Sequence, residues 1–211
     1  MGDGRAEITV EDLIARCAAG ERGFVGSNLP RANLAGANLA GADLTGANLE
    51  AADLAGANLA GARLVSADLR SANLSATSTY LLTANFSGAN LCDADLTAAH
   101  FEGAVFEGAN LVGAELESTY LYGANLRRAN LLSAHLVGAD LTGADLTGAN
   151  LGGANFRRAN FTGANLSGAA VQPGCNLGGS ILCNLNLAPF CHEDVHCLVE
   201  RVHSRRSRAR R

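Results

Sequence analysis

The chain has 211 residues, of which 48% are hydrophobic and only 5% aromatic, and its formal net charge is −4. Six scattered cysteines are too few for a secreted disulfide scaffold, and no apolar run is long enough to cross a membrane. The polar first residues contain no targeting signal, so we expect a cytoplasmic protein.

A short N-terminal helix is predicted within residues 1–21, because Thr9-Val10-Glu11-Asp12 is similar to a capping box. Gly20 ends the pattern, as glycine often does after a helix. The apolar stripe with helical spacing consists of Val10, Leu13, Ile14 and Cys17. We expect this stripe to cover the first structural unit that follows it, as an N-terminal cap.

Residues 22–189 consist almost wholly of one five-residue repeat, written most purely as Ala-Asn-Leu-x-Gly or Ala-Asp-Leu-x-Gly. When the large apolar residue is taken as the centre, 33 repeats align, and 26 of the centres are Leu. The register slips twice in this alignment. An extra pair of residues lies around Thr77 and Ser78, and one extra residue lies near Gly174.

A period of five residues fits neither an α-helix nor an ordinary strand. On a helix, successive Leu centres would spiral around the cylinder and form no stripe. In an extended segment, Ala and Leu are two residues apart and point to the same side, while the Asn or Asp between them points away. The Gly-rich positions that follow must then turn the chain. The repeat therefore predicts a solenoid of short sides and corners.

These residues resemble the repeats of the pentapeptide repeat proteins, pattern A(D/N)LXX, over about Arg22 to Pro189. The resemblance implies an all-β solenoid, a right-handed quadrilateral β-helix with four repeats in each coil and about eight coils. We expect short capping helices at both ends, since stacked repeats leave their terminal apolar faces uncovered. An interior of Ala and Leu would be narrow and filled, with no cavity of ligand size.

A coil of twenty residues places repeats twenty positions apart on one face. The repeats centred on Leu81, Phe101 and Leu121 then share a face with all three tyrosines of the chain. This face is either a partner-binding patch or a ladder of rings that stabilises neighbouring coils. The residues of this predicted aromatic face are Tyr80, His100, Tyr120 and Tyr122.

Acidic residues dominate residues 1–188, which contain 17 acids and 10 arginines. The twenty-residue rule places Glu107 over Arg127 and Glu115 next to His135, so we expect part of this charge to be paired. The outward acids are candidates for a partner-binding acidic surface. They are Asp43, Asp53, Asp68, Asp95, Glu102, Glu107, Glu117, Asp140 and Asp145.

Residues 190–203 predict a second amphipathic helix, which either covers the last coil or pairs with a second copy of the chain. Phe156 and Phe161 are expected to support the same cap or dimer contact. The helix residues assigned to this role are Val195, Leu198 and Val202. Residues 204–211, with five Arg in eight positions, either contact phosphates or form a solvated, disordered tail.

Four residues near the C-terminus have the chemistry of zinc ligands, namely Cys191, His192, His196 and Cys197. Their spacing matches no standard zinc finger, so buried thiols and surface histidines are the favoured interpretation. We expect neither a metal nor any other cofactor.

The repeats scatter Ser, Thr and Asp over a convex surface, whereas a nucleophile needs a positioned base and a site that excludes water. We therefore expect a non-enzymatic protein without a small-molecule substrate. The family resemblance implies a specific role, because its quinolone-resistance and antibiotic self-protection members resemble B-form DNA and engage DNA gyrase or topoisomerase IV. Unlike several of those proteins, this chain has no long loops between coils.

We accordingly expect a protein-binding rod that mimics DNA, binds a type II topoisomerase and protects it from antibiotics that poison the enzyme. The alternative is a cytoplasmic scaffold that binds an unrelated protein through the predicted aromatic face. A nucleic-acid-associated protein acting through residues 204–211 is the third possibility.

Overall fold

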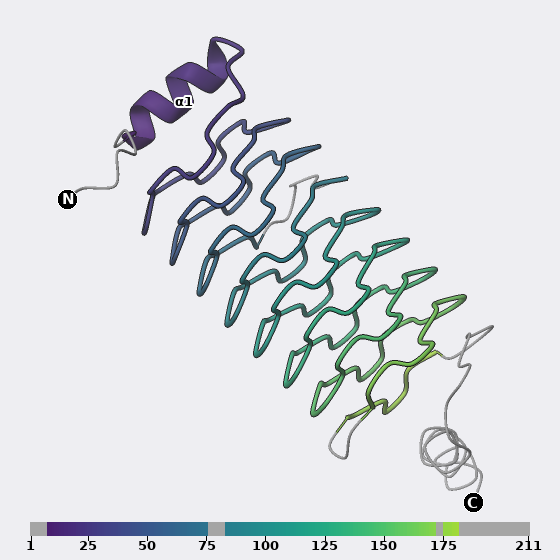
Figure 1. Ribbon diagram of the computed structural model, residues 1–211. Helices are drawn as coiled ribbons and strands as arrows, with labels where there is room; N and C mark the ends of the chain where they lie inside the picture. Colours follow the sequence, from purple (N-terminus) through teal and green to yellow (C-terminus); the bar gives the residue numbers. More distant parts are fainter. Residues whose placement is uncertain (1–7, 76–82, 172–174, 182–211) are drawn as a thin grey trace, which may run out of the picture.

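The computed structural model describes residues 8–75, 83–171 and 175–181, which form one elongated solenoid with a helix at its N-terminal end (Figure 1). Helix α1, Val10–Ala18, is the one regular helix within these ranges. In the rest of the described chain, single residues of neighbouring coils are joined by isolated parallel β-bridges. No β-strand longer than such a bridge occurs in these ranges. None of the described helices is long and apolar enough to cross a membrane.

Each coil contains four repeats, because each repeat pairs with the repeat twenty residues further along the chain. Four successive repeats give the bridges Asn28 to Asn48, Asn33 to Asp53, Asn38 to Asn58 and Asp43 to Arg63. The coil therefore has four sides. We call them faces A, B, C and D, in the order in which the chain visits them from the repeats centred on Phe24, Leu29, Leu34 and Leu39.

Both register slips are absorbed without moving any later repeat to another face. The bridge from Arg63 to Asn85 spans 22 residues, and the bridge from Asn160 to Ile181 spans 21. The extra residues fall in 76–82 and 172–174, outside the described ranges. Face A consequently continues as one column from Gly23 to Asn165 with eight bridged residues.

Backbone hydrogen bonds join neighbouring coils along the axis of the solenoid. In the repeat centred on Leu126, the Leu126 N–H donates to the Asp145 carbonyl at 2.7 Å, and the Asn125 N–H donates to the Ala104 carbonyl at 2.9 Å. A third bond, from Ala129 N–H to the Leu126 carbonyl at 3.1 Å, closes the corner. One repeat thus bonds to the coil before it, to the coil after it and to its own corner.

The corner after each centre needs a residue with positive φ, which explains the glycine in the fifth position of the repeat. Gly108 has φ of 65° there, a conformation that costs glycine little. Eleven described corners use another residue with a similar backbone, among them Ala51 with φ of 55° and Arg128 with φ of 55°. These corners carry local strain that the axial hydrogen bonds must offset.

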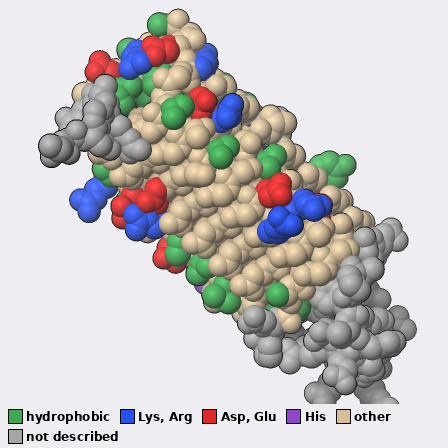
Figure 2. All heavy atoms as spheres, viewed as in Figure 1, with side chains coloured by type: hydrophobic (Ala, Val, Ile, Leu, Met, Phe, Trp, Pro, Cys, Tyr) green, Lys and Arg blue, Asp and Glu red, His purple; other side chains and the backbone are tan. Residues whose placement is uncertain are grey.

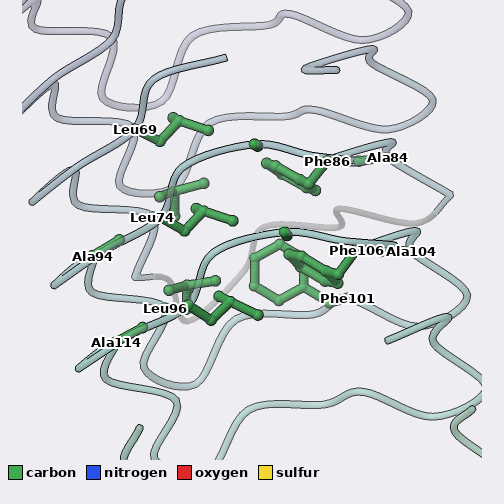
Figure 3. Close-up of a cluster of buried hydrophobic side chains, with 14 of the residues drawn as sticks. Leu69, Leu74, Ala84, Phe86, Ala94, Leu96, Phe101, Ala104, Phe106 and Ala114 are labelled. Carbon is green, nitrogen blue, oxygen red and sulfur yellow. The ribbon is translucent and has the colours of Figure 1, made fainter. Parts of the chain in front are cut away.

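The core is a continuous stack of Leu and Ala side chains, most of them completely buried. Three phenylalanines interrupt the stack in the middle of the solenoid (Figure 3). The rings of Phe86 and Phe106 lie parallel, with centroids 5.0 Å apart, and Phe101 meets Phe106 edge-on at 5.1 Å. The three rings occupy centre positions that Leu holds in most other repeats, and they fill this part of the core by packing against one another.

Helix α1 begins as the capping pattern predicts, since the Thr9 hydroxyl accepts a hydrogen bond from the Asp12 N–H at 3.1 Å. Leu13 and Cys17 are buried and belong to the same apolar cluster as the coils. Ile14, which the predicted stripe included, is 41% exposed. The buried stripe of the helix is therefore narrower than the sequence pattern indicates.

Removal of one core leucine tests the stacked core. Leu126→Ala should lower the free energy of unfolding by about 3 kcal/mol, because a fully buried side chain is replaced by a cavity. Leu132→Ala is the matched control, since Leu132 is 37% exposed and its loss should cost about 0.5 kcal/mol or less. Urea unfolding followed by circular dichroism measures both, and equal losses would contradict the packing described here.

A second substitution tests the strain at the non-glycine corners. Ala51→Gly should stabilise the protein by about 0.5 kcal/mol, because relief of the left-handed backbone outweighs the extra entropy of glycine in the unfolded chain. Ala55→Gly, four residues later at a position without positive φ, should instead destabilise by about the same amount. Thermal unfolding of the two variants should therefore shift in opposite directions.

Candidate functional site

The outward positions of each repeat hold their side chains in fixed directions. The Asn or Asp before the centre accepts a hydrogen bond from the backbone two residues later, as Asp140 Oδ1 does from the Thr142 N–H at 3.0 Å. Neighbouring coils add side-chain ladders, such as Asn150 Nδ2 donating to Asn130 Oδ1 at 2.9 Å. A group at this position is therefore preorganised by the fold, whatever it binds.

The nine acids of the predicted acidic surface do not gather on one face. Asp43, Glu107 and Asp145 lie on face A, Asp68 on face B, Asp53, Asp95 and Glu117 on face C, and Glu102 and Asp140 on face D. Figure 2 agrees, since charged side chains on the visible face form small separate groups. The dense acidic run seen in the sequence is divided because consecutive repeats occupy different faces.

Three of the nine acids have arginine partners. Asp43 lies 3.9 Å from Arg63, and the Thr45 hydroxyl, ahead of Arg63, lowers the pKa of the Asp43 carboxyl. Asp68 pairs with Arg70 at 2.7 Å, and hydrogen bonding to Arg70 lowers the pKa of that carboxyl. These two acids are partly neutralised and offer less charge to a partner than their number indicates.

The third pair differs from the sequence expectation. Arg127 was expected to meet Glu107, but its guanidinium pairs with Asp145 at 3.2 Å. The reason is geometric, because Arg127, at the position after its centre, reaches diagonally toward the Asp position of the next coil, whereas Arg70 at the equivalent position meets Glu50 along the column. Asn165 Nδ2 shows the same diagonal contact with Thr147 Oγ1 at 3.0 Å.

Face C holds three of the six predicted acids that have no arginine partner in the described structure, namely Asp53, Asp95 and Glu117; the other three are Glu107 on face A and Glu102 and Asp140 on face D. Asp95 is bridged to Glu115, and Glu117 lies two residues beyond Glu115 on the same side. The predicted contact between Glu115 and His135 is confirmed, with the His135 Nδ1 atom 3.0 Å from a Glu115 carboxylate oxygen. Asp53 lies two coils before Asp95 and accepts a hydrogen bond from Asn73 Nδ2 at 3.1 Å.

Face D contains the described part of the predicted aromatic face. His100 and Tyr120 are stacked, with ring centroids 4.4 Å apart and an interplanar angle of 12°. Tyr120 is 45% exposed and Tyr122 is 59% exposed. The His100 Nδ1 atom also lies 2.9 Å from Glu102 Oε1, so this aromatic patch includes a carboxylate that the sequence assigned to the acidic surface.

Face B has a feature that sequence reasoning missed. Cys92, Val112 and Leu132 occupy the same position in three successive coils and form a small apolar strip. Burial, followed by the nearby Asp93 carboxylate, raises the pKa of the Cys92 thiol. The twenty-residue column rule would have found this strip, because the three side chains stand twenty residues apart.

Several predicted residues do not reach this surface. Phe156 and Phe161 are fully buried with ring centroids 5.1 Å apart, so they belong to the core, and the cap or dimer contact that they were expected to support lies outside the described residues. Tyr80 lies outside the described residues, as do residues 190–203, for which the sequence predicts a helix, and the candidate zinc ligands. Within the described ranges, no three His, Cys, Asp or Glu side chains are close enough to hold a metal ion.

Solved structures share this architecture. HetL, a pentapeptide repeat protein involved in heterocyst differentiation regulation in the cyanobacterium Nostoc sp. strain PCC 7120, is 31% identical, with a TM-score of 0.51. A trypsin-treated variant of QnrB1, a plasmid-mediated fluoroquinolone resistance protein, is 20% identical with a TM-score of 0.59. Each match covers 85% of this chain and 95% of the other chain. At 20% identity, the likeness to QnrB1 concerns the fold alone.

A comparison with proteins of curated function found no match. The sequence profile of the family described as pentapeptide repeats matches in overlapping segments, at 24–54, 47–78, 84–121, 109–148 and 139–172. These matches cover more than half of the chain and coincide with the bridged coils. The chain therefore belongs to the pentapeptide repeat family and folds as a right-handed quadrilateral β-helix.

Proposed function

We propose that the chain is a non-enzymatic, protein-binding rod that binds DNA gyrase or topoisomerase IV and protects the enzyme from antibiotics that poison it. The observation that carries this proposal is the set of outward carboxylates held in fixed directions on a narrow solenoid. Regularly spaced negative charge on a rigid rod is complementary to a basic saddle that normally holds DNA.

Within this proposal, face C is the face that meets the enzyme. Its carboxylates Asp53, Asp95 and Glu117 have no arginine partner in the described structure, whereas Asp43, Asp68 and Asp145 do. Unpaired surface charge contributes most to electrostatic steering, since a paired acid presents little field to an approaching protein. The fold shared with QnrB1 supports the shape of the rod, and the identity of the partner rests on the charge argument.

The ends of the rod belong to the same proposal. Helix α1 serves as the N-terminal cap, which the burial of Leu13 and Cys17 against the first coils supports. Residues 190–203 form the C-terminal cap or the contact with a second copy. A covered end keeps the rod soluble, because an open coil would expose its Leu and Ala stack.

A gyrase supercoiling assay with and without a fluoroquinolone tests the topoisomerase proposal. The protein should inhibit supercoiling or rescue it from the drug at micromolar concentration. The variant Asp53→Asn, Asp95→Asn, Glu117→Gln should need about tenfold more protein for the same effect, because three unpaired charges are lost. The fold should be retained, because Asn already occupies the position of Asp53 and Asp95 in many repeats and Glu117 is an exposed side chain after its centre.

The matched control removes an equal number of paired acids, Asp43→Asn, Asp68→Asn and Asp145→Asn. We expect its effect on the assay to be within about twofold of the unmodified protein, because arginines already screen these charges. Absence of any effect of the unmodified protein at micromolar concentration would end the topoisomerase proposal. Equal losses in both triple variants would end the assignment to face C.

A second candidate function is a scaffold that binds another protein through the aromatic patch of face D. The exposure of Tyr120 and Tyr122 favours it, since exposed aromatic side chains are typical of binding surfaces. The competing explanation is a ring ladder that only stabilises the coils. The stacking of His100 on Tyr120 fits that explanation, but Tyr122 stacks on no other ring within the described residues.

Alanine substitutions separate the binding patch from a purely structural ladder. Tyr120→Ala should lower the free energy of unfolding by about 1 kcal/mol through loss of the stacked ring. Tyr122→Ala should change it by about 0.5 kcal/mol or less, because this ring is more than half exposed. If Tyr122→Ala destabilises the protein as much as Tyr120→Ala, the ring is structural and the scaffold proposal loses its support.

A further inference from the structure

Face D places two tyrosines and two carboxylates side by side in three successive coils. His100, Tyr120 and Asp140 form one bridged column, with His100 stacked on Tyr120 and Tyr120 bridged to Asp140. Glu102 and Tyr122 occupy the parallel column two residues later. The Gly103 N–H donates to the Tyr122 carbonyl at 2.9 Å, which places these two neighbouring coils in register.

The charge of face D has one sign. The described five-residue segments on this face are 37–41, 57–61, 99–103, 119–123, 139–143 and 159–163. They contain Glu102 and Asp140 but no Arg or Lys. The other faces differ, since face A carries Arg127, face B carries Arg70 and face C carries Arg157. A cation approaching face D therefore meets carboxylates without a competing arginine on the same face.

Both carboxylates retain an oxygen without a protein partner. Glu102 Oε1 is 2.9 Å from His100 Nδ1, and Glu102 Oε2 is buried and has no hydrogen-bond partner. Asp140 Oδ1 accepts from the N–H and the hydroxyl of Thr142, and no described group donates to Asp140 Oδ2. The site thus offers the Asp140 Oδ2 acceptor beside exposed aromatic rings, with no arginine or lysine on the described part of this face.

We propose that this patch binds an arginine side chain presented by a segment of a partner protein. The guanidinium stacks on the exposed ring of Tyr122 and donates hydrogen bonds to the Asp140 carboxylate, and the negative charge of Glu102 on the same face adds to the attraction. Arginine fits better than lysine, because a planar guanidinium can stack on a ring and donate to a carboxylate at the same time. This inference rests on the scaffold function proposed for face D and names the chemistry of its partner.

The binding test uses the full-length protein and two fluorescein-labelled peptides, (Gly-Arg)4 and (Gly-Lys)4, in a fluorescence anisotropy titration. The arginine peptide should bind at least about fivefold more tightly than the lysine peptide, which carries the same charge. Equal affinities would overturn the proposal, because they would show that charge alone attracts the peptide.

Three variants locate the binding site. Tyr122→Ala should weaken binding of the arginine peptide about threefold, whereas Tyr122→Phe, which keeps the ring, should restore it. Asp140→Asn should weaken binding about fivefold. Asp95→Asn is the matched control, since it removes one acid at the same repeat position on face C and should change affinity less than about twofold. A loss with Asp95→Asn equal to that with Asp140→Asn would overturn the proposal.

The last variant tests whether arginines of the chain itself compete with the peptide for the patch. In a full-length variant, the five Arg of 204–211 are replaced by Ser. If the peptide binds only to this variant, residues 204–211 occupy the patch and the proposal of a separate partner is overturned. Equal binding to both forms supports it.

These results are separable from those of the proposed functions. A stable Tyr122→Ala protein without arginine selectivity would overturn this inference and leave the scaffold function standing. Destabilisation by Tyr122→Ala would remove the scaffold function itself. The supercoiling assay reports on the topoisomerase proposal independently of both.

Discussion

The axial backbone ladder is the interaction on which the rest of this molecule depends. Each centre donates its N–H to the coil after it, and the residue before the centre donates to the coil before it, as Leu126 and Asn125 do. These bonds align only when every coil closes in the same register. That requirement accounts for the corners with positive φ at Ala51 and Arg128, where the ladder holds a backbone that these residues do not favour.

Because of this ladder, the stability of the fold depends little on which side chains occupy the outward positions. Leu and Ala fill the interior and the backbone supplies the cohesion, so the two outward positions of a repeat can change without loss of the fold. Each face has therefore acquired its own chemistry. Face C presents unpaired acids, face B an apolar strip at Val112 and Leu132, and face D exposed tyrosines beside carboxylates.

A binding surface on such a rod is assembled from residues that are distant in the sequence. Glu102 and Asp140 are 38 residues apart, yet the stacking of coils places them on face D on either side of the Tyr120 coil. Conversely, Glu102 and Glu107 are near neighbours in the chain and lie on different faces. A partner that recognises one face thus contacts a column of repeats. A run of acids in the sequence therefore does not predict the charge of any one face.

The sequence determined the solenoid and, through the family resemblance, its period of twenty residues and local contacts such as Glu115 with His135, because strict repetition transmits one register along the chain. The bridges of the structure show in addition that the faces continue across both slips. It did not determine the partner of Arg127 or the exposure of Ile14. Those depend on where a side chain leans and on which edge of a coil is covered. Only the tertiary structure decides such matters, since the place in the repeat sets whether a side chain points inward or outward, whereas its neighbours in the adjacent coils set which partner it reaches.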